Sequence, residues 1–336
     1  MLDIYIEKLS AHTSLTASEA QQAMLEMLSA QTPVEKIKTY LKTLHDKGET
    51  AEEILGTIAA LRSSMIEIPI SYSTLDIVGT GGDRANTVNI STGAAILAAS
   101  CGVPIAKHGN RAVSSLAGAA DVLEALGLDI HMPIERIITC LKNLNIAFCF
   151  APNFHPALAQ LKTIRREMGT PTVLNLIGPL LNPARAQHYL MGVFSEKLLQ
   201  PFADVLSGLN VKKSAIVHSN GMDEITCSAP TQVIEIEGAT QKSYIINPEK
   251  LGFKLYSLDA LKGGSATDNA AILRDAFGGK PGAVADTLIL NAGMGLYLYG
   301  KTENLIDGIT LARENLKTGQ ALTLLEQWIL FSKEVG

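Results

Sequence analysis

The fold is decided by the stretch Leu75-Asp76-Ile77-Val78-Gly79-Thr80-Gly81-Gly82-Asp83, in which a short apolar run leads directly into a glycine-rich loop. The apolar run predicts a buried strand, and the glycines let the backbone take positive φ and approach a ligand closely. In open α/β sheets, ligands bind at the carboxyl ends of strands. Successive loop amides favour an anion, whereas the Asp83 carboxylate suits hydroxyl groups or metal-bound water. A tight turn without a ligand is the alternative.

On the C-terminal side of this stretch, short β-like runs alternate with longer helical patterns. The β-like runs cover residues 104–106, 147–150, 189–193 and 214–217. The helical patterns cover residues 94–100, 120–126, 134–144, 268–277, 305–316 and 320–331. We therefore expect an α/β domain with a mostly parallel central sheet that is flanked by helices.

The residues before this stretch predict a small helical domain. Three capping boxes, each a Thr followed three positions later by a Glu, mark helix starts: Thr16 with Glu19, Thr32 with Glu35, and Thr50 with Glu53. Pro33 suits the first helical position, and Pro69 biases Ile68 away from helix. We expect a helical domain over residues 1–68 and an α/β domain over 69–336, with a segment near 165–185 packing back on the helices.

Composition excludes several classes of protein. Of 336 residues 47% are hydrophobic, and the net charge of -5 is unlike the basic face of proteins that bind duplex nucleic acid. No apolar run reaches the roughly 18 residues typical of a membrane span. The cysteines are far apart and indicate free thiols in a reducing cytoplasm: Cys101, Cys140, Cys149 and Cys227.

Two further segments carry polar side chains where a phosphate group could bind. Residues 87–92 include two Thr, an Asn and a Ser before a helical pattern, more than one helix cap needs, which favours a phosphate at the helix start. Residues 107–111, Lys-His-Gly-Asn-Arg, follow the next strand and precede Ser114 and Ser115. Charged and neutral donors of this kind suit a pyrophosphate, although His108 could instead be a structural histidine.

Together these segments resemble the signature of the anthranilate phosphoribosyltransferase family. The similar segments are residues 79–83, 86–92, 107–111, 151–157, 165–169, 175–183 and 218–224, so that the resemblance covers nearly the whole chain. It implies transfer of the phosphoribosyl group of phosphoribosyl pyrophosphate to the amino group of anthranilate, giving N-(5-phosphoribosyl)anthranilate and pyrophosphate in tryptophan biosynthesis. It also implies Mg²⁺, a homodimer formed through the helical domain, and a cytoplasmic location.

The resemblance assigns roles to residues of this sequence. Anthranilate is expected at Asn110 and Arg165, with Gly79, His108 and Gly178 lining the same path. Mg²⁺ is expected at Ser91, Asp223 and Glu224, directly or through water. The phosphoribosyl pyrophosphate site is expected at Gly79, Gly82, Asp83, Thr87, Asn89, Ile90, Ser91, Thr92, Lys107, His108, Gly109, Asn110, Arg111, Ala112, Val113, Ser114, Ser115 and Ala119.

Elementary chemistry agrees with these roles. The adjacent Asp223 and Glu224 would repel each other without a cation, and hard carboxylate oxygens suit Mg²⁺, although surface acids on a loop are the alternative. Arg165 can hold a carboxylate with two parallel donors or pair with Glu167. Catalysis is expected to rest on electrostatics and orientation, so no certain catalytic residue is assigned.

Three positions depart from the commonest pattern of the family: Arg84 replaces a glycine, Leu116 a frequent lysine, and Ala119 a frequent serine. They affect the expected donor affinity and not the expected reaction. Two other functions remain open from the sequence, namely a pyrimidine nucleoside phosphorylase and a non-catalytic relative that binds nucleic acid. The net charge of -5 and the Asp223–Glu224 pair argue against them.

Overall fold

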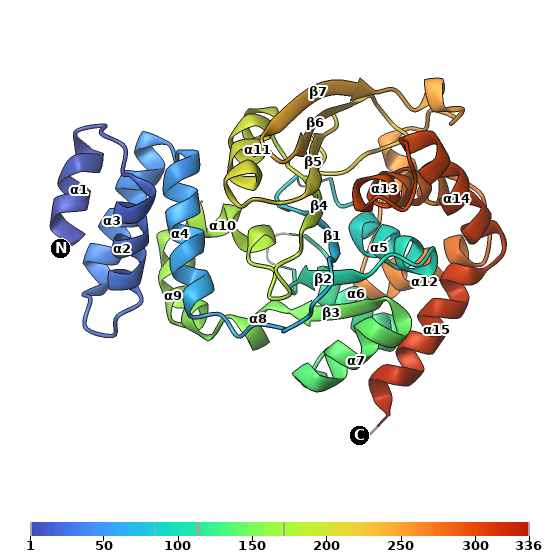
Figure 1. The fold of residues 1–336 in the computed structure, drawn as a ribbon, viewed down its shortest axis with the longest axis horizontal. Coiled ribbons are helices and arrows are strands. Elements are labelled where there is room, and N and C mark those ends of the chain that lie inside the picture. The colour runs from blue at the N-terminus through green and yellow to red at the C-terminus, as the bar shows by residue number, and fades with distance from the viewer. Residues whose placement is uncertain (1, 84, 113–114, 171, 335–336) are drawn as a thin grey trace.

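The computed structural model describes residues 2–83, 85–112, 115–170 and 172–334, apart from the side chains of Gln160, Lys162 and Arg165. A bundle of helices lies at one end of the molecule, and a central sheet with helices on both sides forms the rest (Figure 1). The bundle consists of α1 (Leu2–Ser10), α2 (Ala17–Met27), α3 (Val34–Lys47) and α4 (Ala51–Ser63).

Two of the three predicted capping boxes are confirmed. Thr16 and Thr50 each cap a helix, and the Glu three residues later bonds back to the cap. The box predicted at Thr32 is wrong, because its hydroxyl donates to the Glu26 carbonyl 2.5 Å away, near the end of α2. Pro33 consequently occupies the cap position of α3, one residue before the predicted place.

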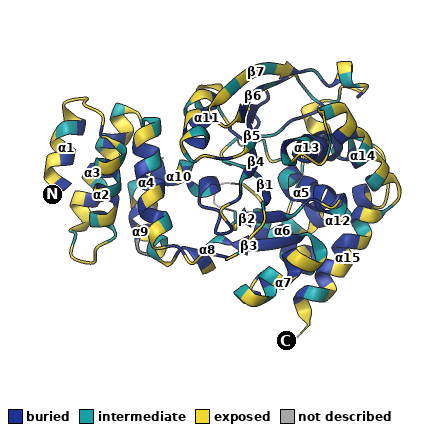
Figure 2. Ribbon diagram, in the orientation of Figure 1, coloured by how far each residue is buried: buried dark blue, intermediate teal, exposed yellow. Residues whose placement is uncertain are grey.

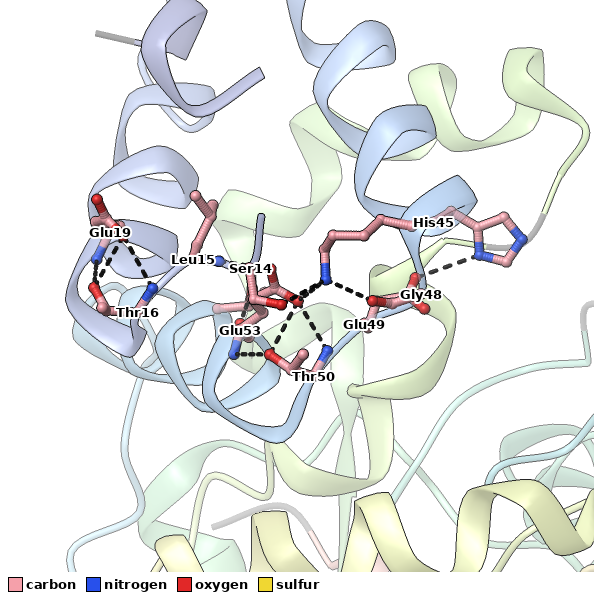
Figure 3. A network of polar contacts seen from close by, with 11 residues as sticks. Ser14, Leu15, Thr16, Glu19, His45, Gly48, Glu49, Thr50 and Glu53 are labelled. Atoms are coloured by element: carbon pink, nitrogen blue, oxygen red, sulfur yellow. Dashed lines mark hydrogen bonds and ion pairs between the residues drawn. The ribbon is translucent and has the colours of Figure 1, made fainter. Parts of the chain in front are cut away.

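The second box has a structural role beyond its helix (Figure 3). The Glu53 carboxylate is completely buried and accepts from the Leu15 amide at 2.9 Å and from the Thr50 amide at 2.8 Å. The Lys47 ammonium lies 2.9 Å away and balances its charge. The carboxylate therefore joins the start of α4 to the linker between α1 and α2, with its hydrogen-bonding needs met.

The sheet has seven strands in the order β3-β2-β1-β4-β5-β6-β7. They are β1 (Leu75–Gly79), β2 (Ile105–Gly109), β3 (Ile146–Phe150), β4 (His188–Gly192), β5 (Lys213–His218), β6 (Thr231–Glu237) and β7 (Thr240–Ile246). The first five pair in parallel, which confirms the predicted runs and the mostly parallel sheet. The antiparallel strands β6 and β7 were not predicted.

Helices cover both faces of this sheet. The six predicted helices are confirmed with small shifts at their ends: α5 (Ile90–Ser100), α6 (Ala119–Leu126), α7 (Ile134–Leu144), α12 (Ala266–Phe277), α14 (Leu305–Lys317) and α15 (Gln320–Lys333). Helices α8 (Ala151–Phe154), α9 (Pro156–Met168), α10 (Val173–Leu176), α11 (Leu199–Gly208) and α13 (Ala283–Tyr299) were not predicted. In the described part of the chain no helix has both the length and the apolar character to cross a membrane.

The sheet separates two apolar cores, and its five parallel strands are largely buried (Figure 2). Along β4, Leu190 joins the core formed with α5 and α13, whereas Tyr189 and Met191 join the opposite core. The second core also contains α11, residues of α9 and α10, and the inner faces of α1 to α4. The four cysteines are buried and free, as the sequence predicts.

Candidate active site

The glycine-rich loop lies at the carboxyl edge of the sheet, where the strand order reverses. From β1 the chain builds β2 and β3 on one side and then adds β4 on the other side of β1. Such a reversal creates a crevice that binds ligands in open α/β sheets. Gly81 and Gly82 have φ of 66° and 86°, which confirms the expected use of positive φ in this loop.

Three acidic side chains converge beside the loop. One carboxylate oxygen from each of Asp83, Asp223 and Glu224 lies within 4.8 Å of the others. The Gly81 amide donates to Asp223 Oδ2 at 2.7 Å, which fixes the carboxylate against the loop. A Cβ on Gly79 would lie 2.3 Å from the same oxygen, so only glycine leaves room for it.

Burial and mutual repulsion make this cluster electrostatically unfavourable. Burial, followed by the charge of Asp83, raises the pKa of Asp223 to about 6. Burial, followed by the charge of Asp223, raises the pKa of Glu224 well above its usual value. Within the described residues Glu224 Oε2 is buried and has no hydrogen-bond partner. A group of hard oxygen ligands with excess negative charge and an unsatisfied oxygen fits a bound Mg²⁺.

Lys107 is buried next to this cluster. Its ammonium donates to the Ile77 carbonyl at 2.8 Å, and it interacts with the charges of Asp76 and Glu224. Burial lowers the pKa of Lys107, and these carboxylates oppose the shift. The side chain thus supplies positive charge from inside the sheet, behind the loop.

Helix α5 begins at the same edge. Asn89 stands at its cap position, but its side chain makes no cap bond: the amide donates to the Ala117 carbonyl at 3.1 Å and accepts from Asn269 at 2.8 Å. Helix capping by the Asn89 side chain therefore does not explain the polar residues at the start of α5. The buried Thr92 hydroxyl has no partner in the described chain, and the Ser91 backbone contacts Glu224.

Two buried histidines face each other near Gly178. The ring centroids of His108 and His155 are 5.3 Å apart; among the described residues Nε2 of His108 lacks a partner, and the His155 ring contacts the Leu181 backbone without a hydrogen bond of good geometry. Burial, reinforced by His155, lowers the pKa of His108 to about 3. Burial lowers the pKa of His155 to about 4. Both rings are therefore neutral near pH 7, and Nε2 of His108 is free to accept a hydrogen bond from a ligand or donate one to it.

Comparison with known proteins identifies the family. Residues 71–322 match the model of the glycosyl transferase family α/β domain, and residues 4–65 match that of its helical bundle domain. The chain is 43% identical to the anthranilate phosphoribosyltransferase of Chlamydia felis over 100% of its length and 98% of that protein. It is 42% identical to that of Mesorhizobium japonicum, with 98% of each chain covered.

Solved structures agree with the sequence matches. The enzyme of Thermus thermophilus superposes with a TM-score of 0.93 at 40% identity, covering 98% of this chain and 99% of that one. The chain belongs to the anthranilate phosphoribosyltransferase family. The enzyme of Saccharomyces cerevisiae in complex with PRPP and Mg gives a TM-score of 0.91 at 28% identity, covering 99% and 98%. The protein is therefore an enzyme of the pentosyltransferase class, and the resemblance found in its sequence is confirmed.

Several other residues expected from the anthranilate phosphoribosyltransferase pattern have structural roles that the described chain shows. Gly109 needs its missing side chain, because a Cβ would lie 2.9 Å from the Phe148 ring. Thr87 forms an isolated bridge with Lys262. Ile90 begins α5, Ala119 begins α6, and Gly178 begins a 3₁₀ turn with open space around its Cβ position. Arg84, Val113, Ser114 and the side chain of Arg165 lie outside the described residues.

The loop after β2 is held by helix α6. The Arg111 guanidinium donates to both oxygens of Glu124 and also pairs with Asp121 at 3.1 Å. The Ala112 amide donates to Asp121 at 2.9 Å, Asn110 accepts from the Arg111 amide, and Ser115 lies 3.5 Å from the Ala117 carbonyl. In this structure Arg111 is engaged by α6, and its side chain remains 45% exposed.

Reasoning from the sequence did not identify His155 as a site residue, and it did not predict that Asp83 lies against Asp223 and Glu224. The segment 151–157 pointed to the acceptor side, but no residue in it was singled out. Asp83 was expected to accept from hydroxyls or metal-bound water, and the structure adds it to the acidic cluster.

The acidic cluster predicts a pH-dependent effect of Mg²⁺ on stability. Because the pKa of Asp223 is raised to about 6 in the folded state, the metal-free folded protein binds more protons than the unfolded chain between about pH 4 and 6. The free energy of unfolding therefore decreases as the pH rises through this range. Mg²⁺ should offset the loss by binding the folded state, by about 2.7 kcal/mol at one hundred times its Kd. We expect the gain in Tm from Mg²⁺ over EDTA to be larger at pH 7.5 than at pH 5. An equal gain at both values would contradict this.

Proposed function

We propose that this protein transfers the phosphoribosyl group of phosphoribosyl pyrophosphate to the amino group of anthranilate and releases pyrophosphate, as a step of tryptophan biosynthesis. The observation that carries the proposal is the acidic cluster beside the glycine loop, in a chain that matches anthranilate phosphoribosyltransferases over its whole length. The Saccharomyces cerevisiae structures with PRPP and Mg and with 4-fluoroanthranilate support it.

The donor side of the crevice is built for a polyanion. Breaking the bond between ribose C1 and pyrophosphate leaves a cationic sugar and a highly charged leaving group, so preorganised positive charge lowers the barrier. Amides of the loop 79–82 and the N-terminal end of α5 supply fixed dipoles. Asp83, Asp223, Glu224 and Ser91 would hold Mg²⁺, which would neutralise charge on the pyrophosphate as it departs.

The acceptor side needs orientation and not a strong base. An aniline-type amine is unprotonated near neutral pH, so it can attack without first losing a proton. The neutral ring of His108 can accept a hydrogen bond and orient the amine. Arg165 and Asn110 remain the proposed partners of the anthranilate carboxylate.

The decisive experiment follows anthranilate fluorescence. We expect the signal to decay only when phosphoribosyl pyrophosphate and Mg²⁺ are both present, and omission of either should stop the decay. Phosphorolysis of thymidine with inorganic phosphate, at a rate equal to or above anthranilate consumption, would favour the nucleoside phosphorylase instead. A salt-dependent gel shift with single-stranded DNA tests the nucleic-acid-binding alternative in parallel.

We also propose a homodimer in the cytoplasm. Ile4 of α1 and Val34 of α3 are apolar yet 58% and 46% exposed, so the helical bundle offers a face that a second copy can cover. The proposed domains remain 1–68 and 69–336, with the segment near 165–185 joined to the bundle through contacts such as Arg62 to the Leu180 carbonyl. Light scattering should give about twice the chain mass of 35.8 kDa, and a monomeric mass would refute the dimer.

A further inference from the structure

Strands β1 and β2 separate before they reach the active site. Five residue pairs align β1 with β4, and five align β2 with β3. Between β1 and β2, the described strands share a single aligned pair, Leu75 with Ile105. The main-chain ladder is therefore open over the part of the two strands that leads to the glycine loop and to His108.

Side chains occupy the place of the missing ladder. Nδ2 of Asn182 donates to the Ala106 carbonyl at 2.7 Å and to Oδ2 of Asp76 at 2.8 Å. The other oxygen of Asp76 lies 3.4 Å from the His108 amide, close to the limit for a hydrogen bond. Asp76 and Asn182 are both buried completely. Together they satisfy a carbonyl and an amide of β2 that β1 would otherwise have paired.

The same Asn182 fixes the loop on the acceptor side. Its Oδ1 accepts from the Ala184 amide at 2.9 Å, so every hydrogen-bonding group of the amide is used. The loop begins at Gly178, whose backbone contacts the His108 ring. A second tether, from Arg62 in α4 to the Leu180 carbonyl at 2.9 Å, holds the loop from the helical bundle.

We propose that Asp76 and Asn182 are positioning residues for the acceptor, because they hold the loop 178–184 and the backbone of His108 in one fixed relation. This inference rests on the proposed function, which places His108 and Gly178 beside anthranilate. Neither residue touches the acceptor itself. They act through the loop and through β2, and their effect should fall on the acceptor more than on the donor.

A structural role alone does not explain the arrangement. An ordinary ladder would satisfy the Ala106 carbonyl and the His108 amide with main-chain groups, whereas a buried carboxylate costs free energy. The side chains of Asp76 and Asn182 instead lie between β1 and β2 at the crevice, and Asn182 also binds the loop 178–184 to the sheet there.

Two variants and one control test the proposal. Asp76→Asn keeps the shape but replaces one acceptor oxygen by a donor, so it opposes either Asn182 or the His108 amide. Asn182→Ala removes the link entirely, and if it does not fold, Asp76→Asn carries the test. Val205→Ala removes buried atoms from α11 and serves as a destabilised control.

We expect each folded variant to raise the KM for anthranilate at least fivefold, while Val205→Ala changes neither KM. The KM for phosphoribosyl pyrophosphate should rise less than twofold in Asn182→Ala, and by a smaller factor than the anthranilate KM in Asp76→Asn, which also removes a charge that interacts with Lys107. Hydrogen exchange should accelerate in peptides covering 175–184 in the variants and not in the control. This readout needs no activity, so it separates the inference from the proposed function, which fails if wild-type protein leaves anthranilate unchanged. Wild-type exchange in this segment, or equal shifts of both KM values, would overturn the proposal.

Discussion

Replacing both buried acids of the cluster, Asp223→Asn with Glu224→Gln, lowers kcat at least tenfold at fixed Mg²⁺, which corresponds to about 1.4 kcal/mol of lost transition-state stabilisation. The two amides keep the size of the carboxylates but remove the charge that recruits the cation. The amide introduced by Asp223→Asn can still accept from the Gly81 N–H through its one oxygen, as the Asp223 carboxylate does at 2.7 Å. The loop should therefore keep its place while the metal site is lost.

The loss of activity in this variant should not be accompanied by a loss of stability. Because burial and mutual repulsion raise the pKa of both acids, neutral amides should leave the Tm in EDTA unchanged or higher. The gain in Tm that Mg²⁺ gives the wild type should disappear. Asp307→Asn, at the exposed start of α14, removes one negative charge as a control and should leave kcat unaltered. Wild-type Mg²⁺ dependence in the double variant would refute the metal role.

Much of the fold could be predicted from local patterns. The five parallel strands are apolar runs bounded by turns, and helices such as α7 carry a clear apolar stripe. Helix α13 was missed because it is apolar on nearly every side, with most of its residues buried, so it shows no stripe. Strand β7 was missed because it is half-exposed at the sheet edge and rich in polar residues. Periodicity reports the contrast between two faces and fails where both faces are alike.

The site was predictable in its parts and not in its geometry. Sequence alone indicated an anion loop and suggested that the Asp223–Glu224 pair needs a cation. It could not place Asp83 against them, since these positions are far apart along the chain and only the order of strands brings them together. Thr32 shows the same limit locally: its hydroxyl donates to the Glu26 carbonyl, and the capping arrangement, in which the hydroxyl would accept from the Glu35 amide, does not form.

Two glycines at the ends of neighbouring strands leave room for different atoms of Asp223. A Cβ on Gly79 would lie 2.3 Å from the carboxylate oxygen of Asp223, whereas a Cβ on Gly192 would lie 1.4 Å from its backbone oxygen. Gly79 and Gly192 are aligned partners in β1 and β4, so both distances are set by the same pair of strands. Alanine at either position must displace something, because real Cβ contacts are not shorter than 3.0 Å.

What is displaced decides the outcome. In Gly79→Ala the Asp223 carboxylate can rotate away, at the loss of its bond to Gly81, so the fold survives while the acidic cluster is broken. We expect kcat to fall at least tenfold, the gain in Tm from Mg²⁺ to vanish, and the Tm in EDTA to drop by no more than about 3 °C, roughly 1 kcal/mol.

In Gly192→Ala the backbone of Asp223 must move against β4, an overpacking that costs about 1–3 kcal/mol and lowers the Tm itself. Thermal melts of both variants with Mg²⁺ and with EDTA, beside anthranilate fluorescence, distinguish the two effects. Full Mg²⁺ stabilisation in Gly79→Ala would mean that Asp223 Oδ2 is not a ligand of the metal.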